Sequence, residues 1–271
     1  MHPAGDSFGK DNMKNNQPDE EDKGFVLMPR YQMRRNALKK ILKSAGCRNK
    51  TLLEIGYGAG EIFLLYQKLG LYVEGYDFSE AAYEHASRNY PGAGIILLKE
   101  MPEKKRYDYV VACEVLEHIE NDVEELKEWR NYLKDNGRMI ISVPAHQKRW
   151  GESDVYNGHW RRYERAELEK KLAKAGMRIE KIYTYDFPAC LFLDGMRDKS
   201  RKRKMRQKNW KKRGRSEATK KSGVERNFNP VVLALSHPAL WFPFIKAGEL
   251  FYDTDWGSAY ILVASVRRTG V

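Results

Sequence analysis

Leu52-Leu-Glu-Ile-Gly-Tyr-Gly-Ala-Gly60 is the stretch of this sequence that decides the fold. An apolar run leads into a loop with three glycines, and a second apolar run, residues 71–76, ends at Asp77. Glycines let the backbone turn sharply and approach a ligand, and an acid at the end of the next strand can hold two ribose hydroxyls. The spacing therefore predicts a nucleoside cofactor bound on a parallel sheet.

Glu54 separates two classes of nucleoside cofactor. The dinucleotide fingerprint is G-x-G-x-x-G, with a pyrophosphate on a helix N-terminus, whereas Gly56, Gly58 and Gly60 follow the pattern G-x-G-x-G. A carboxylate two residues before the first glycine repels a pyrophosphate but suits the ammonium group of a methionine moiety. The pattern Glu-x-Gly-x-Gly-x-Gly with a downstream acid resembles the class I S-adenosylmethionine-dependent methyltransferases, which implies S-adenosylmethionine as the cofactor.

Three later segments follow the order of that family. Residues 107–118 read as a buried strand that leaves through a polar turn, and they are similar to the fourth-strand motif of the quinone-biosynthesis and small-molecule branch. Residues 131–144 match the family's helix, glycine turn and fifth strand. Residues 158–163, Gly-His-Trp-Arg-Arg-Tyr, resemble a Gly-His-x-Arg-Arg-Tyr signature of members in bacterial surface-glycan and secondary-metabolite pathways.

The resemblance implies an α/β fold with a Rossmann-like, seven-stranded, mostly parallel sheet, helices on both faces and a reversed last strand. Alternating apolar runs and helical patterns agree with such a sheet. We expect strands at 51–55, 71–76, 94–98, 108–112, 138–143, 177–185 and 259–266, and helices at 30–44, 61–69, 80–89, 122–133 and 164–175. Ser79 is the expected N-cap of the third helix, and Asn136-Gly137 is the expected turn before the fifth strand.

The resemblance assigns the cofactor contacts residue by residue. The three glycines, the acid before them and Asp77 are the expected binding residues, with Phe78 beside the adenine. The family often has an acid after the third strand that reaches the adenine amino group, and Glu100 stands here in place of the usual Asp. Tyr31 and Tyr57 are expected either to face the sulfonium, since a cation sits well over an aromatic ring, or to pack as ordinary side chains.

His118 follows the fourth strand, where the resemblance places the acceptor. Methyl transfer is an in-line displacement that gains much of its rate from positioning, and a base is needed only if the acceptor must lose a proton. The pKa of histidine suits that task near neutrality. We expect His118 to be the catalytic base, with His159 as the second candidate. The alternative is that Glu117 and His118 cap and shape the loop.

Arg161, Arg162 and Tyr163 are the expected substrate-binding residues. Two adjacent arginines before a helix suit a carboxylate or phosphate of the acceptor. The alternative is that the arginines pair with nearby acids and only fix the loop.

The formal net charge of +12 is concentrated in one segment. Residues 197–226 hold 15 Lys or Arg against three acids, so the remainder of the chain is formally neutral. Residues 228–251 are apolar and aromatic, but their apolar run is shorter than the ~20 residues of a membrane-spanning helix. We expect this insertion between strands six and seven to be either a lid over the site or a segment that contacts an anionic membrane surface.

The expected domain plan has three parts: a polar, disordered tail at 1–24, a methyltransferase core at 25–186 and 257–271, and the basic and aromatic insertion at 187–256. Three cysteines without paired spacing argue against a disulfide framework or a zinc site and fit a reducing cytosol. The N-terminal residues show no apolar signal segment. We expect a cytoplasmic protein, with peripheral contact to the inner face of the membrane as the further expectation.

The predicted function is S-adenosylmethionine-dependent methylation of a small-molecule, glycan-linked or lipid-linked acceptor at oxygen or nitrogen, without a stable protein partner. A nucleic-acid methyltransferase would use the basic segment on phosphates, but residues 112–116 read Ala-Cys-Glu-Val-Leu and lack the Asn/Asp-Pro-Pro-aromatic run that grips a flipped base. A non-catalytic cofactor-binding protein is the remaining alternative, against which the intact glycine loop and His118 argue.

Overall fold

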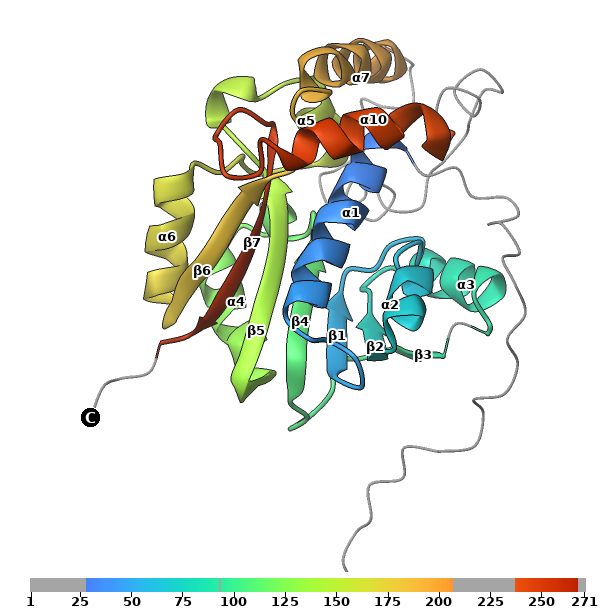
Figure 1. Cartoon of the computed structure of the whole chain (residues 1–271), viewed down its shortest axis with the longest axis vertical. Coiled ribbons are helices and arrows are strands. Elements are labelled where there is room, and N and C mark those ends of the chain that lie inside the picture. Colours follow the sequence, from blue (N-terminus) through green and yellow to red (C-terminus); the bar gives the residue numbers. More distant parts are fainter. Residues whose placement is uncertain (1–27, 93, 207–236, 268–271) are drawn as a thin grey trace, which may run out of the picture.

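The computed structural model describes residues 28–92, 94–206 and 237–267 (Figure 1). The predicted tail at 1–24 and residues 207–226 of the basic segment lie outside these ranges.

A seven-stranded sheet forms the centre of the described structure, in the order β3-β2-β1-β4-β5-β7-β6. β7 runs antiparallel to both of its neighbours, and the pairs among β3, β2, β1, β4 and β5 are parallel. The predicted fold class is therefore confirmed. The strands are β1 (Thr51–Ile55), β2 (Tyr72–Tyr76), β3 (Ile95–Leu98), β4 (Tyr107–Cys113), β5 (Leu133–Pro144), β6 (Met177–Thr184) and β7 (Ala259–Val266).

Helices cover both faces of the sheet. Successive side chains of a strand point to opposite faces, so Leu52 packs with α1, α2 and α3, while Leu53 packs with α4 and α6. The two apolar clusters hold the sheet between two helical layers. The α-helices are α1 (Pro29–Ser44), α2 (Phe63–Leu69), α3 (Glu80–Asn89), α4 (Asp122–Asn131), α5 (Glu152–Asn157), α6 (Arg165–Lys174), α7 (Cys190–Met205) and α10 (Pro238–Glu249), and short 3-10 helices are η1 (Leu116–His118) and η2 (Gln147–Arg149).

Two local predictions differ in detail from the structure. Ser79 takes the predicted N-cap position of α3, but its side chain makes no capping hydrogen bond, and its backbone N–H donates to Asp77. The predicted turn before the fifth strand lies inside β5, and helix α4 already ends at Asn131. The turn is visible as a shift in the β4–β5 register, because Tyr107 pairs with Leu133 but Tyr109 pairs with Arg138.

The described parts of the predicted insertion form α7 and α10, which lie with α5 at the carboxyl edge of the parallel strands (Figure 1). Helix α10 lies on α1, where the Asn36 side-chain amide donates to Glu249 at 3.0 Å. The Phe192 ring of α7 lies 6.0 Å from Trp241 and 5.9 Å from Phe244 of α10. Among the described residues, no helix combines the length and the apolar character that crossing a bilayer requires.

Candidate active site

The loops that follow β1 and β4 pack directly on each other. Gly56 has a φ of 73°, a conformation that side chains disfavour, and a Cβ atom there would lie 2.5 Å from Cγ2 of Val115. The order of the sheet reverses between β1 and β4. Ligands of open α/β sheets bind outside the carboxyl ends of strands at such a reversal, so these two loops mark the candidate site.

Glu54 is a buried acid with an incomplete set of partners. The residue is 3% exposed, and among the described residues its Oε2 atom has no hydrogen-bond partner. Burial raises the pKa of Glu54 to about 8, against smaller opposing effects of Tyr66 and Arg34. Leaving a buried carboxylate oxygen without a partner is costly. The position therefore fits a ligand that brings a positive group to the end of β1.

Asp77 lies beside the glycine loop. Its Oδ2 accepts a hydrogen bond from Gly58 N at 2.8 Å, and its Oδ1 accepts one from Ser79 N at 2.9 Å. Phe78 follows with 52% of its surface exposed, so its ring is accessible at the same edge. Glu100 is also exposed and lies two residues beyond β3, next to the end of β2. The structure thus brings the predicted cofactor residues of β1, β2 and β3 to one edge.

The two predicted tyrosines differ in their surroundings. Tyr57 is 6% exposed, and its ring packs on Phe63 with centroids 5.3 Å apart, which favours the alternative of an ordinary core side chain. Tyr31 lies on α1, and the Arg34 guanidinium lies 4.9 Å over its ring. One face of Tyr31 therefore already holds a cation of the protein.

Glu114 is a site residue that sequence reasoning missed. Its φ is 59°, a rare conformation for a non-glycine residue that often marks a functional position. Its Oε1 accepts hydrogen bonds from the hydroxyls of Ser142 and Tyr185, both at 3.2 Å. Burial alone would raise its pKa, but Arg30 and Arg34 outweigh burial and hold the pKa at about 2. An ionised carboxylate is therefore fixed between the β4 loop and α1.

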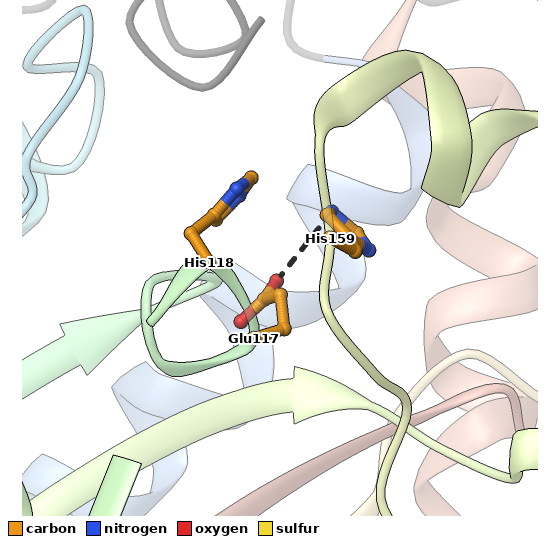
Figure 2. A group of neighbouring side chains, drawn as sticks. All are labelled: Glu117, His118 and His159. Atoms are coloured by element: carbon orange, nitrogen blue, oxygen red, sulfur yellow. Dashed lines mark ion pairs between the residues drawn. The ribbon is translucent and has the colours of Figure 1, made fainter. Parts of the chain in front are cut away.

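His118 and His159 come together from distant parts of the sequence (Figure 2). Their rings meet edge to face, with centroids 4.7 Å apart and an interplanar angle of 88°. The Nδ1 atom of His159 lies 2.9 Å from Oδ1 of Asp154. An ionised carboxylate only accepts hydrogen bonds, so Nδ1 carries the proton and Nε2 is left with a lone pair. This Nε2 atom lies 3.9 Å from Oε1 of Glu117.

Glu117 is the second site residue whose role sequence reasoning missed. It is fully buried, and neither of its carboxylate oxygens has a hydrogen-bond partner in the part of the chain that the structure describes. Burial and Glu114 raise the pKa of Glu117 well above its ordinary value. Burial and His159 lower the pKa of His118 to about 3. The only sequence signal for the cluster of Glu114, Glu117 and His118 is that two acids and a histidine follow a buried strand directly.

The predicted substrate residues are occupied by contacts within their own loop. Arg162 is 2% exposed, and its Nε donates to Asp154 at 2.9 Å. Arg161 donates to Asp122 at 2.6 Å, and the Tyr163 hydroxyl donates to the same carboxylate at 2.9 Å. This geometry favours the alternative in which the arginines fix the loop. The predicted role of these three side chains in substrate binding stays a prediction, and Asp122 and Asp154 already bind all three of them.

A family model described as a methyltransferase domain matches residues 30–182. This chain belongs to the methyltransferase domain family. It is 36% identical over 106 residues to a ubiquinone biosynthesis O-methyltransferase of Pelagibacter ubique, covering 35% of this chain and 42% of the relative. A second protein of that name, from Bradyrhizobium diazoefficiens, is 34% identical over 98 residues, covering 34% of this chain and 39% of the relative. The match thus spans about two fifths of the length of these curated relatives.

A solved structure agrees with this fold. An S-adenosylmethionine-dependent methyltransferase from Mesorhizobium loti matches with a TM-score of 0.51 at 14% identity, covering 83% of this chain and 95% of that one. At this identity the likeness concerns the fold alone. The predicted family and its S-adenosylmethionine cofactor are confirmed. The Oε2 atom of Glu54, which no described residue partners, fits the ammonium group that this cofactor carries.

Proposed function

We propose that this protein transfers the methyl group of S-adenosylmethionine to a hydroxyl oxygen of a small-molecule acceptor. The observation that carries the proposal is the buried Oε2 atom of Glu54, which has no hydrogen-bond partner among the described residues. Glu54 lies at the start of the glycine loop, which packs on the loop that bears His118. The O-methyltransferase names of the relatives support oxygen as the acceptor atom, and nitrogen is the alternative.

The proposed cofactor contacts follow from the positions of the side chains. Glu54 binds the ammonium group, Asp77 binds the ribose hydroxyls, and the exposed ring of Phe78 stacks on the adenine. Glu100 and Tyr31 are the remaining proposed contacts of the cofactor. The backbone of Gly56, Gly58 and Gly60 approaches the methionine moiety, where a side chain at Gly56 would displace Val115.

In the reaction, the acceptor oxygen attacks the methyl carbon, and the carbon–sulfur bond breaks with its electron pair left on sulfur. The hydroxyl proton has to leave the oxygen. His118 and His159 are the proposed catalytic residues, because His159, between α5 and α6, meets the ring of His118 at the end of η1, in the loop after β4 (Figure 2). Holding the three reacting centres in line supplies much of the remaining rate.

Calorimetric titration with S-adenosylmethionine and S-adenosylhomocysteine tests the proposal. We expect both to bind and NAD not to bind. Asp77→Ala should weaken binding by roughly 10- to 100-fold, as expected for lost hydrogen bonds to a charged group. Unchanged affinity in this variant would contradict the cofactor assignment. Transfer of labelled methyl to an RNA pool rather than to small molecules would overturn the acceptor class.

We also infer that the surface formed by α7 and α10 contacts an anionic lipid surface and that the acceptor carries an apolar tail. The two helices expose Leu191 and Met196 of α7 and Leu240 and Phe242 of α10, with exposed fractions of 54–68%. The second half of α7 is rich in Lys and Arg. Exposed apolar groups beside basic groups suit the headgroup region of an anionic membrane.

Vesicles that contain anionic lipid test this second proposal by co-sedimentation at low and high salt. The wild-type protein should bind at low salt, and the paired variant Leu240→Ser with Phe242→Ser should bind at least ~10-fold more weakly, because apolar burial supplies part of the affinity. Ile96→Ser is the matched control, since Ile96 is 52% exposed on β3, away from this face. Absence of binding by the wild type at low salt would overturn the lipid proposal and leave the two helices as a lid.

A further inference from the structure

Glu117, His118 and His159 present one ligand atom each within 4.8 Å of one another (Figure 2). Bonds of about 2.1 Å to a divalent ion place its ligand atoms roughly 3–4 Å apart. Side-chain movements of about an ångström therefore suffice to bring all three atoms to one ion. We propose that these three residues bind one divalent transition-metal ion at the carboxyl end of β4.

Glu117 supplies the first independent support. The side chain is fully buried, and among the described residues neither oxygen has a hydrogen-bond partner. Buried polar atoms of native proteins are almost always partnered, and each exception calls for an explanation. An ion between Glu117 and the two histidines gives this carboxylate the partner that no described residue provides.

His159 supplies the second support. Its Nδ1 is bound to the Asp154 carboxylate, so its Nε2 presents a lone pair toward Glu117. Asp154 is itself fixed by Arg162 at 2.9 Å and by the backbone N–H of Gly151 at 2.9 Å. Histidines that bind metals usually donate their other ring N–H to such a carboxylate, which sets the tautomer and the ring orientation. In the proposed site, Arg162 therefore holds Asp154 in the position from which it orients His159.

The donor set indicates the kind of ion. Two imidazole nitrogens and one carboxylate oxygen suit Mn²⁺, Fe²⁺, Co²⁺ or Zn²⁺, whereas Mg²⁺ and Ca²⁺ prefer sites built from oxygen donors. Three protein ligands leave coordination positions open for a substrate.

The role of the ion rests on the proposed function. An acceptor hydroxyl that binds the ion at an open position loses its proton to solvent more readily, since a bound cation lowers the pKa of a coordinated oxygen. The resulting oxygen then forms its bond to the methyl carbon while the methyl–sulfur bond breaks and its electron pair stays on sulfur. In this scheme His118 and His159 act as metal ligands rather than as bases, and the acceptor class is a hydroxyl compound that can chelate the ion.

The experiment is a Mn²⁺ titration of chelator-treated protein without a histidine tag, followed by electron paramagnetic resonance of free Mn²⁺. We expect one ion per chain. Glu117→Gln and His159→Gln should each weaken binding at least ~10-fold, and Asp154→Asn should weaken it by about 10- to 100-fold through ligand orientation. His237→Asn is the control, because His237 is an exposed histidine at the start of α10, outside the group.

Binding of S-adenosylmethionine by the same variants separates the two proposals. The affinity of Glu117→Gln and His159→Gln for the cofactor should match the wild type, which also shows that these variants are folded. A wild-type protein that binds the cofactor but takes up neither Mn²⁺ nor Co²⁺ below ~1 mM overturns the metal site alone. Equal Mn²⁺ affinity in Glu117→Gln and wild type also overturns the metal site alone. Failure of the wild type to bind the cofactor overturns the proposed function, whatever the metal result.

Discussion

The two edges of the sheet use acidic side chains in opposite ways. At the amino edge of β1 and β4, Asp108 accepts hydrogen bonds from the backbone N–H of Thr51 at 2.9 Å, from the hydroxyl of Thr51 at 2.8 Å and from Lys134 at 2.9 Å. At the carboxyl edge of the same two strands, Glu54 and Glu117 are buried, and they keep oxygens that no described residue partners.

The pKa values follow this difference. Burial would raise the pKa of Asp108, but Lys134 and Thr51 outweigh it and hold the pKa at about 2. Burial dominates at Glu54 and raises its pKa to about 8. An acid whose lone pairs are filled by the protein stabilises the fold, whereas one left incomplete lowers stability until a ligand arrives. The contrast therefore separates structural acids from ligand-binding acids.

The largest expected effect is on the pH dependence of stability. Folded Glu54 keeps a proton that the unfolded chain releases between about pH 4.5 and 8, so stability falls as pH rises through this window. The free energy of unfolding of the wild type, measured in urea, should drop by about 3 kcal/mol relative to Glu54→Gln between pH 5 and 8. The Asp108→Asn variant should keep the wild-type slope in that range. If the free energy of unfolding changed with pH in the same way in the wild type and in Glu54→Gln, Glu54 would not be a ligand-binding acid of the proposed kind.

A smaller effect is expected on cofactor affinity. Glu54→Gln keeps the shape of the side chain but cannot release a proton to become the carboxylate that faces a bound ammonium group. Calorimetry at neutral pH should therefore show roughly 10- to 100-fold weaker binding of S-adenosylmethionine. Asp108→Asn is the matched change at the other edge and should leave the affinity unaltered. Equal losses in both variants would show that the two edges do not differ in the proposed way.

The smallest expected effect is the stability of Asp108→Asn itself. The low pKa of Asp108 means that its ionised form stabilises the fold above about pH 4, and that this contribution is lost as pH falls toward 2. The side chain is 21% exposed, so solvent screening limits the loss at neutral pH to about 1 kcal/mol. Thermal or urea unfolding at pH 7 and pH 2.5 checks this. An undiminished difference at the lower pH would be inconsistent with an electrostatic origin.

The strands and the cofactor loop could be predicted because their signals are local. The apolar run of β4 reflects a parallel strand buried on both faces, and Gly56 stands where the backbone needs a positive φ and room for Val115. The ends of elements were less predictable. The predicted turn at 136–137, for example, lies within β5 as a register shift, because Leu133, before the turn, already pairs with Tyr107 of β4.

The acceptor side of the site could be predicted only in part, because its contacts join distant residues. His118 and His159 could be named singly, but their meeting with Glu117 depends on how the loop after β5 returns to β4. Arg161 and Arg162 looked suited to a substrate, since the sequence does not show that Asp122 and Asp154 reach them first.

The place of β7 in the sheet has a consequence for the synthesis of this protein. β7 separates β5 from β6, yet it follows both in the chain, after the insertion. A ribosome that adds about 5–20 residues per second needs roughly 4–15 s to make the ~70 residues between β6 and β7. During that interval the nascent chain presents β5 as an open edge, to which foreign strands can add. The length of the insertion thus sets how long β5 stays exposed during synthesis, and a longer insertion would lengthen that exposure before the sheet can close.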